Sequence, residues 1–230
     1  MLVKNLNEVL NKIEAACRRA GRNPEDITLV AVSKTKPLSD IEELIPAGQL
    51  DFGENYVQEL VEKYRNVSVP VRWHMIGHLQ TNKVKQIIDK TVLIHSVDSL
   101  HLAERIEKEA ARREIRADIL IQVNIAEEET KYGISDEELF ALVRSIAGLP
   151  HVHVRGLMTS APYVTDPEKN RCYFAKLHKL FVDIRDKNID NVDMDFLSMG
   201  MTNDYEVAIE EGANMVRVGT GIFGERDYSS

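Results

Sequence analysis

The residues of this sequence best suited to covalent chemistry are two lysines at the end of a predicted strand. That segment reads Ile27-Thr28-Leu29-Val30-Ala31-Val32-Ser33-Lys34-Thr35-Lys36-Pro37. Lys34 shares the alternation of Val30 and Val32, so it should point to the same side of the sheet. Burial lowers the pKa of a lysine and makes its amine available as a nucleophile. Lys36 directly precedes a proline, where the chain leaves the sheet, so Lys34 is the stronger candidate.

Two later segments have the composition of a phosphate cradle. One reads Ser198-Met199-Gly200-Met201-Thr202 and the other reads Gly219-Thr220-Gly221-Ile222-Phe223-Gly224. Glycines let backbone N–H groups approach an anion, and hydroxyl groups add further donors. The second segment also matches the dinucleotide pattern G-x-G-x-x-G, but the sequence given leaves no room after it for the second strand and acidic residue of such a site.

Arg217 completes this set of residues, because it shares the alternation of Gly219 and should point inward. A lysine, a phosphate cradle and an inward cation predict a phosphorylated aldehyde held as a Schiff base, and pyridoxal 5′-phosphate (PLP) fits well. Its aldehyde would be on Lys34 and its ring nitrogen would face Arg217. An arginine disfavours a protonated pyridine, so the site should hold the cofactor firmly and activate it poorly.

The elements that position these residues alternate regularly along the chain. An amphipathic helix from Val3 to Ala20 ends at Gly21. Eight short apolar segments then begin near Ile27, Asp51, Val71, Val92, Asp118, Val152, Asp195 and Met215. Amphipathic stretches follow seven of them, as expected for parallel strands joined by helices.

Eight such units predict a single TIM (β/α)8 barrel with an extra N-terminal helix, formed by residues 1–230 as one domain. The rival architecture is a doubly wound open sheet. No composition shift, linker or repeat divides the chain, which favours the barrel. In the fifth strand, Ile119 and Ile121 should pack under helices, whereas Leu120 and Gln122 should face the barrel interior.

Further residues at the carboxyl ends of the predicted strands complete the candidate site. Asn55 follows the second strand and His78 follows the third, and we predict that both contribute to cofactor binding. Lys131 follows the fifth strand and could be a second attachment point for the aldehyde during transfer to other proteins. We predict no metal site, because the spacing of His74 and His78 on a strand matches no zinc motif.

Composition excludes several other classes of protein. The chain has 29 Lys and Arg against 37 Asp and Glu, and its formal net charge of −8 argues against binding to nucleic acids or anionic membranes. It has two cysteines, so no disulfide framework is expected. No signal peptide or membrane span is recognisable, and we predict a cytoplasmic protein.

Six motifs together resemble the pyridoxal phosphate homeostasis protein family. They are Ala31-Val32-Ser33-Lys34-Thr35-Lys36-Pro37, Phe52-Gly53-Glu54-Asn55-Tyr56, Trp73-His74-Met75-Ile76-Gly77-His78, Gly156-Leu157-Met158-Thr159, Leu197-Ser198-Met199-Gly200-Met201-Thr202-Asn203-Asp204 and Val216-Arg217-Val218-Gly219-Thr220-Gly221. The resemblance implies a barrel like the N-terminal domain of alanine racemases, with the cofactor on Lys34 and its ring nitrogen at Arg217. It implies phosphate contacts from Ser198, Gly200, Met201, Gly219 and Thr220.

Members of this family are thought to bind and distribute PLP, and to influence amino-acid and keto-acid balance, without turning over a substrate. The resemblance therefore predicts a non-catalytic carrier that is a monomer or weak homodimer and that supplies PLP-dependent apoenzymes. A PLP-dependent racemase or decarboxylase on the same barrel is the first alternative. Such enzymes need a second domain, and the sequence given ends ten residues after Thr220. The second alternative is a Schiff-base aldolase acting on a sugar phosphate.

Overall fold

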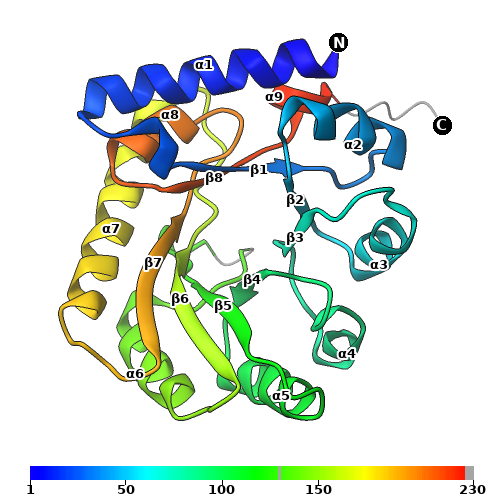
Figure 1. Cartoon of the computed structure of the whole chain (residues 1–230). Helices are drawn as coiled ribbons and strands as arrows, with labels where there is room; N and C mark the ends of the chain where they lie inside the picture. The colour runs from blue at the N-terminus through cyan, green and yellow to red at the C-terminus, as the bar shows by residue number, and fades with distance from the viewer. Residues whose placement is uncertain (129–130, 226–230) are drawn as a thin grey trace.

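The computed structural model describes residues 1–128 and 131–225. Its centre is a closed barrel of eight parallel strands, each hydrogen-bonded to the next in chain order, with the eighth paired to the first (Figure 1). The strands are β1 (Thr28–Val32), β2 (Asp51–Glu54), β3 (Arg72–Met75), β4 (Leu93–Val97), β5 (Ala117–Gln122), β6 (Val152–Met158), β7 (Val192–Ser198) and β8 (Met215–Val218). The predicted (β/α)8 barrel is confirmed.

Helices surround the barrel as an outer layer (Figure 1). They are α1 (Leu2–Ala20), α2 (Leu38–Leu44), α3 (Val57–Asn66), α4 (Val84–Ile87), α5 (Leu100–Ala111), α6 (Asp136–Ala147), α7 (Arg171–Arg185), α8 (Tyr205–Glu210) and α9 (Thr220–Phe223). Their apolar faces pack against the outward side chains of the strands and form the larger hydrophobic core. The part of the chain that the structure describes contains no helix long and apolar enough to cross a membrane.

Side chains of alternating strand positions fill the barrel interior. A small apolar cluster there contains Val30, Leu93, Leu120, Met158 and Met215. Ile119 and Ile121 belong instead to the core between strands and helices, as predicted for the fifth strand. The barrel is therefore packed through its middle, and a ligand site can lie only at its ends.

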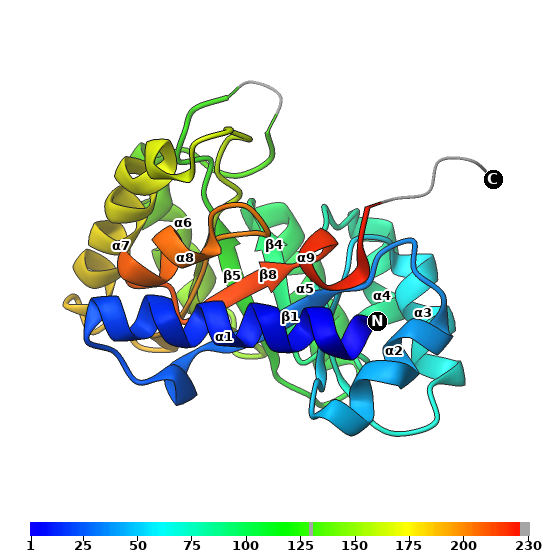
Figure 2. The same cartoon turned by 90° about the horizontal axis from the view of Figure 1, so that it is seen from above.

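The N-terminal helix α1 lies across the barrel beside β1 and β8 (Figure 2). It packs against α2, α8 and α9, and its buried residues include Leu6, Val9 and Ile13. Gly21 ends the helix with a left-handed φ of 65°, as the sequence predicts. Because α9 is only four residues long, α1 covers outer barrel surface that a full-length helix after β8 would otherwise cover.

Element boundaries differ from the prediction in two places that matter for the site. β1 ends at Val32, so Lys34 lies in the turn that follows the strand. β8 ends at Val218, and the glycine-rich segment after it forms the short helix α9. That one domain comprises residues 1–230 stays a prediction.

Candidate functional site

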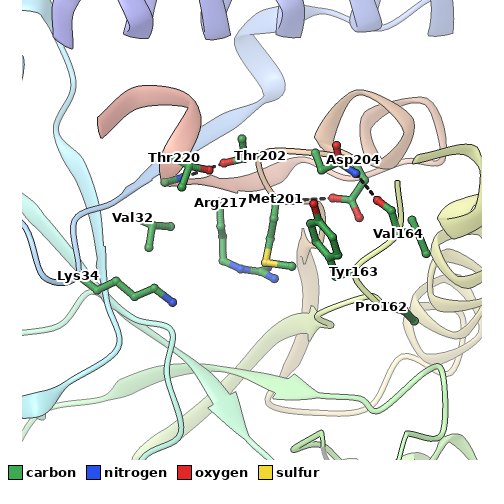
Figure 3. Close-up of a pocket in the computed structure, with 12 residues that line it drawn as sticks. Val32, Lys34, Pro162, Tyr163, Val164, Met201, Thr202, Asp204, Arg217 and Thr220 are labelled. Atoms are coloured by element: carbon green, nitrogen blue, oxygen red, sulfur yellow. Dashed lines mark hydrogen bonds between the residues drawn. The ribbon is translucent and has the colours of Figure 1, made fainter. Parts of the chain in front are cut away.

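A pocket of about 530 Å³ opens at the carboxyl ends of β1, β7 and β8, within the size range of small-ligand sites. Most of the residues predicted to bind the cofactor line it (Figure 3). The lining comprises Val32, Lys34, Pro162, Tyr163, Val164, Met201, Thr202, Asn203, Asp204, Arg217, Gly219 and Thr220. The structure thus brings together residues that are up to 188 positions apart in the sequence, since Val32 and Thr220 line one cavity.

Lys34 is half-buried and extends into this pocket with its amine directed toward Arg217 (Figure 3). The turn that carries it is closed by a hydrogen bond from the Lys36 N–H to the Ser33 carbonyl, at 3.0 Å. Lys36 points elsewhere, because its Nζ donates to the Phe223 carbonyl at 3.1 Å. The sequence-based preference for Lys34 over Lys36 agrees with this geometry.

An ion-pair cluster, of which Glu54 and Lys63 are buried and Glu59 is partly exposed, holds the backbone on both sides of Lys34. The ammonium of Lys63, on α3, donates to the Ser33 carbonyl and to Glu54 Oε1, each at 2.7 Å, while the Ser33 hydroxyl donates to the same Glu54 oxygen at 2.6 Å. Glu59 Oε2 accepts from the Thr35 N–H at 2.8 Å and from Lys63 at 3.3 Å. Thr35 has a left-handed φ of 62°, so these bonds stabilise a strained turn.

Glu54 is fully buried. Burial raises the pKa of its carboxyl group to about 7, although Lys63 and Ser33 counteract part of that rise. The sequence motifs include Glu54 without giving it a role, and Lys63 lies outside all of them. Lys63 could have been recognised from its position, because it follows Val57 and Leu60 on the apolar face of an amphipathic helix.

Arg217 projects from β8 into the same pocket, with 4% of its surface exposed. Its guanidinium donates to the Ser198 hydroxyl and to the Thr159 carbonyl, each at 2.7 Å. Burial lowers the pKa of Arg217 to about 10, which still leaves it a cation at neutral pH. It therefore presents a fixed, desolvated positive charge opposite Lys34.

The two glycine-rich segments form another side of the pocket (Figure 3). Gly200 has a left-handed φ of 90°, and a Cβ there would lie 2.6 Å from Ala208 Cβ. The Met201 N–H donates to Asp204 Oδ1 at 2.7 Å, and the Gly219 N–H donates to Thr202 Oγ1 at 3.3 Å. Two of the N–H groups predicted to contact phosphate thus have partners within the chain.

Asp204 and Thr202 were not among the predicted site residues, although both lie within a quoted motif. Asp204 is buried and also accepts from Asn170 Nδ2 at 2.7 Å. Thr202 accepts from the N–H groups of Gly219 and Gly221 and so ties the two glycine-rich segments together. A sequence gives no indication of such cross-loop bonds, because they depend on how β7 and β8 end side by side.

Four predicted residues, Gly200, Asn55, His78 and Ser198, are not among the residues that line the Lys34 pocket. Asn55 and His78 line a separate pocket of about 380 Å³ at the ends of β2 and β3, where His78 stacks on Tyr132 with ring centroids 4.0 Å apart. Ser198 is fully buried and is not among the lining residues of the Lys34 pocket. Asn55 and His78 thus line a different pocket from Lys34, and Ser198 lies behind the pocket wall as a partner of Arg217.

Lys131 lies on the loop after β5 and donates to the Ala161 carbonyl at 3.2 Å. Ala161 directly precedes the segment Pro162–Val164, which lines the Lys34 pocket. Lys131 is thus next to the pocket but not in its wall. Among residues 1–128 and 131–225, no group of three or more His, Cys, Asp or Glu side chains is arranged to hold a metal ion.

A closed parallel barrel with a lysine, an arginine and glycine-rich loops at one mouth defines a class of cofactor-binding barrel. The family described as "Alanine racemase, N-terminal domain" matches residues 5–227. A relative from Aquifex aeolicus, named "Pyridoxal phosphate homeostasis protein", is 47% identical over 98% of both chains. This chain belongs to the pyridoxal phosphate homeostasis protein family, as its motifs predict.

Two solved structures have the same architecture. An unknown protein from Bifidobacterium adolescentis superposes with a TM-score of 0.92 and 34% identity, covering 96% of this chain and 94% of its own. PipY from Synechococcus elongatus PCC7942, solved with PLP bound, superposes with a TM-score of 0.85 and 31% identity, covering 97% of this chain and 100% of its own.

Proposed function

We propose that this protein binds PLP covalently on Lys34 and acts in PLP homeostasis, as a non-catalytic carrier and regulator. The observation that carries the proposal is the placement of the Lys34 amine and the Arg217 guanidinium in one pocket of about 530 Å³. The relatives named for PLP homeostasis and the PLP-bound PipY support the choice of cofactor.

The residues of the pocket suit the parts of this cofactor. The Lys34 Nζ would form a C=N bond with the aldehyde carbon, and one water molecule would leave. The Arg217 guanidinium would donate to the ring nitrogen. Hydroxyl and backbone groups of Gly200, Met201, Gly219 and Thr220 would contact the phosphate, with the Met201 and Gly219 N–H groups changing partners from Asp204 and Thr202.

Arg217 is also the reason to expect binding without turnover. A bound PLP activates an amino acid by withdrawing electrons into a protonated pyridine ring. A buried guanidinium that remains charged at neutral pH opposes that protonation, so the cofactor would be a weak electron sink. We therefore expect firm attachment of PLP and no efficient racemisation, decarboxylation or aldol chemistry.

The proposed role includes delivery of PLP to apoenzymes by a monomer or weak homodimer in the cytoplasm. Lys131 is the candidate for an intermediate acceptor, because it lies against the segment that lines the pocket. Its amine would attack the carbon of the C=N bond, and the Lys34 amine would leave as the new C=N bond forms. No other reactant is needed for this exchange.

The test is a visible absorption spectrum of the purified chain with PLP, followed by borohydride reduction and peptide mapping. We expect a Schiff-base band and a label on Lys34. Lys34→Ala should lose both, whereas Lys36→Ala, which changes the neighbouring lysine outside the pocket, should keep both. A label on another residue contradicts the assignment. Sustained turnover with any of a panel of amino acids favours the racemase alternative.

A further inference from the structure

A row of polar side chains crosses the interior of the barrel beside its small apolar cluster. It consists of Asp51 on β2, His74 on β3, His95 on β4 and Ser198 on β7, and we name these four residues the interior polar row. His74 is 3% exposed, and His95 and Ser198 are fully buried. Burying a polar side chain costs free energy unless the side chain is hydrogen-bonded. The members of this row therefore need hydrogen-bond partners inside the barrel.

The contacts of the interior polar row form one unbroken chain that ends at Arg217. His74 Nε2 lies 3.0 Å from Asp51 Oδ1, and His74 Nδ1 lies 3.0 Å from His95 Nε2. His95 Nδ1 lies 3.0 Å from Ser198 Oγ, which accepts from Arg217 Nη1 at 2.7 Å. The chain thus runs from the amino-terminal end of the barrel to the candidate cofactor pocket.

The direction of the hydrogen bonds follows from the charge states of Asp51 and His95. Burial raises the pKa of Asp51, but hydrogen bonds from His74 and Arg72 outweigh this and leave that pKa below its ordinary value. Asp51 is therefore a carboxylate that accepts from His74 Nε2. Burial, with the nearby His74 and Arg217, holds the pKa of His95 well below its ordinary value, so His95 is neutral and has a single ring proton.

One assignment then uses each proton once. His74 donates from Nε2 to Asp51 and accepts at Nδ1, His95 donates from Nε2 to His74, and the Ser198 hydroxyl donates to His95 Nδ1. The Ser198 oxygen is left with its lone pairs toward Arg217, which can only donate. If His74 were doubly protonated, it would donate from Nδ1 to His95, and His95 would donate from Nδ1 to the Ser198 oxygen. The Ser198 hydroxyl proton would then have no acceptor within the row.

We propose that the interior polar row positions the Arg217 guanidinium at the ring-nitrogen side of the cofactor pocket. It does so by fixing Ser198 as a hydrogen-bond acceptor. Ser198 and His95 are then positioning residues that act through Arg217. In this arrangement the Ser198 hydroxyl has no proton to offer to a phosphate, so its predicted phosphate contact is replaced by this role. The inference rests on the proposed function, since it assumes that Arg217 meets the ring of PLP.

The donor order can be tested on the full-length chain without cofactor. In ¹⁵N-histidine-labelled protein, we expect His95 to be protonated on Nε2 and unprotonated on Nδ1, and His74 to be in the same tautomer. Ser198→Ala and His95→Leu interrupt the row at two points. Comparison with these variants assigns the ring-nitrogen signals to His74 and His95, and each substitution should change the signals of the histidines that remain in the row. A His95 protonated on Nδ1 in the wild type overturns the proposal.

The positioning role is tested with two ligands, PLP and its 1-deaza analogue, in which carbon replaces the ring nitrogen. Because only PLP can accept from Arg217, Ser198→Ala should weaken PLP binding by about tenfold, the size of one lost hydrogen bond, and weaken analogue binding less. The matched control is His153→Leu, which removes a buried histidine bonded to Asp118 and Asp193 outside the row. It should leave the ratio of the two affinities unchanged.

The outcomes separate the two proposals. Equal losses for PLP and the analogue in Ser198→Ala overturn the positioning role. If neither ligand binds the wild type, the proposed function fails, and the donor order is still decided by the histidine signals. Crystal structures of the wild type and Ser198→Ala should show the guanidinium displaced only in the variant, and an unmoved guanidinium contradicts the inference.

Discussion

The Lys63 ammonium lies 2.7 Å from Glu54 Oε1, and both side chains are buried next to the backbone that carries Lys34. The pair joins α3 to the end of β2, and both of its members bond to Ser33. Lys63 also bonds to Glu59, which accepts from the Thr35 N–H. A buried ion pair is weak evidence of net stabilisation, but removing one partner leaves an uncompensated charge. The geometry therefore indicates that the pair fixes the orientation of the turn that carries Lys34.

Lys63→Met tests this pair. At pH 8, above the pKa of Glu54, we expect it to lower the free energy of unfolding by roughly 3–5 kcal/mol, because it leaves Glu54 buried without its cation. Urea denaturation of the unloaded protein measures the loss. Lys179→Met is the matched control, since Lys179 is exposed and forms only a surface ion pair with Asp183, and it should cost no more than about 0.5 kcal/mol. Equal losses in the two variants would show that the buried pair has no special role.

The pH dependence of stability should report on Glu54. Its pKa is about 7 in the folded state against an ordinary value of 4.5, so the folded protein binds this proton more tightly than the unfolded chain does. The resulting stabilisation is fully present below pH 4.5 and is lost as pH rises to about 7. Over that window it amounts to roughly 3 kcal/mol.

Glu54→Gln removes this titration, so the difference in unfolding free energy between wild type and variant should change with pH between 4.5 and 7. The measurement is a set of urea titrations at several pH values. Histidines and other carboxylates titrate in both proteins and cancel to first order in the difference. Parallel pH profiles for the two proteins would contradict the raised pKa of Glu54.

Gly200→Ala should be more destabilising than Gly48→Ala. Both glycines have a left-handed φ, of 90° and 91°, so both substitutions cost about 1–2 kcal/mol of backbone strain. Only at Gly200 would the new Cβ clash, with Ala208 and with the backbone of Tyr205. We expect an additional cost of about 1–3 kcal/mol at that position, measured by urea denaturation, together with weaker PLP binding. If the two substitutions lowered the free energy of unfolding equally, the loop after β7 would have to move to accommodate the new Cβ without cost.

Lys131→Ala should slow the transfer of PLP from the loaded protein to an apoenzyme while leaving the Schiff-base band on Lys34 in place. The readout is the rate at which the apoenzyme regains activity. Lys85→Ala, an exposed lysine on α4, is the control and should transfer at the wild-type rate. Transfer by Lys131→Ala at the wild-type rate would remove Lys131 from the proposal.

Much of the architecture could be predicted from the sequence because it depends on local patterns. The spacing of Leu6, Ile13 and Cys17 predicts α1, and Gly21 predicts its end. The alternation within β5 predicts which side chains face the interior. Boundaries were less accurate at β7, which begins at Val192 rather than near Asp195. There Asp193 and Asp195 pair with His153 and Arg155 on β6. Because charged residues alternate with apolar ones at its start, β7 does not begin as an apolar segment in the sequence.

The candidate site was predictable only in part. Lys34, Arg217 and the two glycine-rich segments were recognisable because backbone position and residue type suffice to nominate them. Asn55 and His78 also stand at strand ends, yet they line a different pocket, since the barrel mouth is wide enough to hold more than one. Position along a strand does not specify which part of the rim a side chain reaches.

The sequence by itself determined the alternation of strands and helices and the family, and it nominated the lysine that we propose as the attachment point, because periodicity and motifs are properties of short segments. Only the tertiary structure decided that Lys63 pairs with Glu54 beside that lysine, and that Asp51, His74, His95 and Ser198 form a row ending at Arg217. These contacts join residues from different strands and helices. They exist because closing the barrel places the inward side chains of separate strands within hydrogen-bonding distance, which no local pattern encodes.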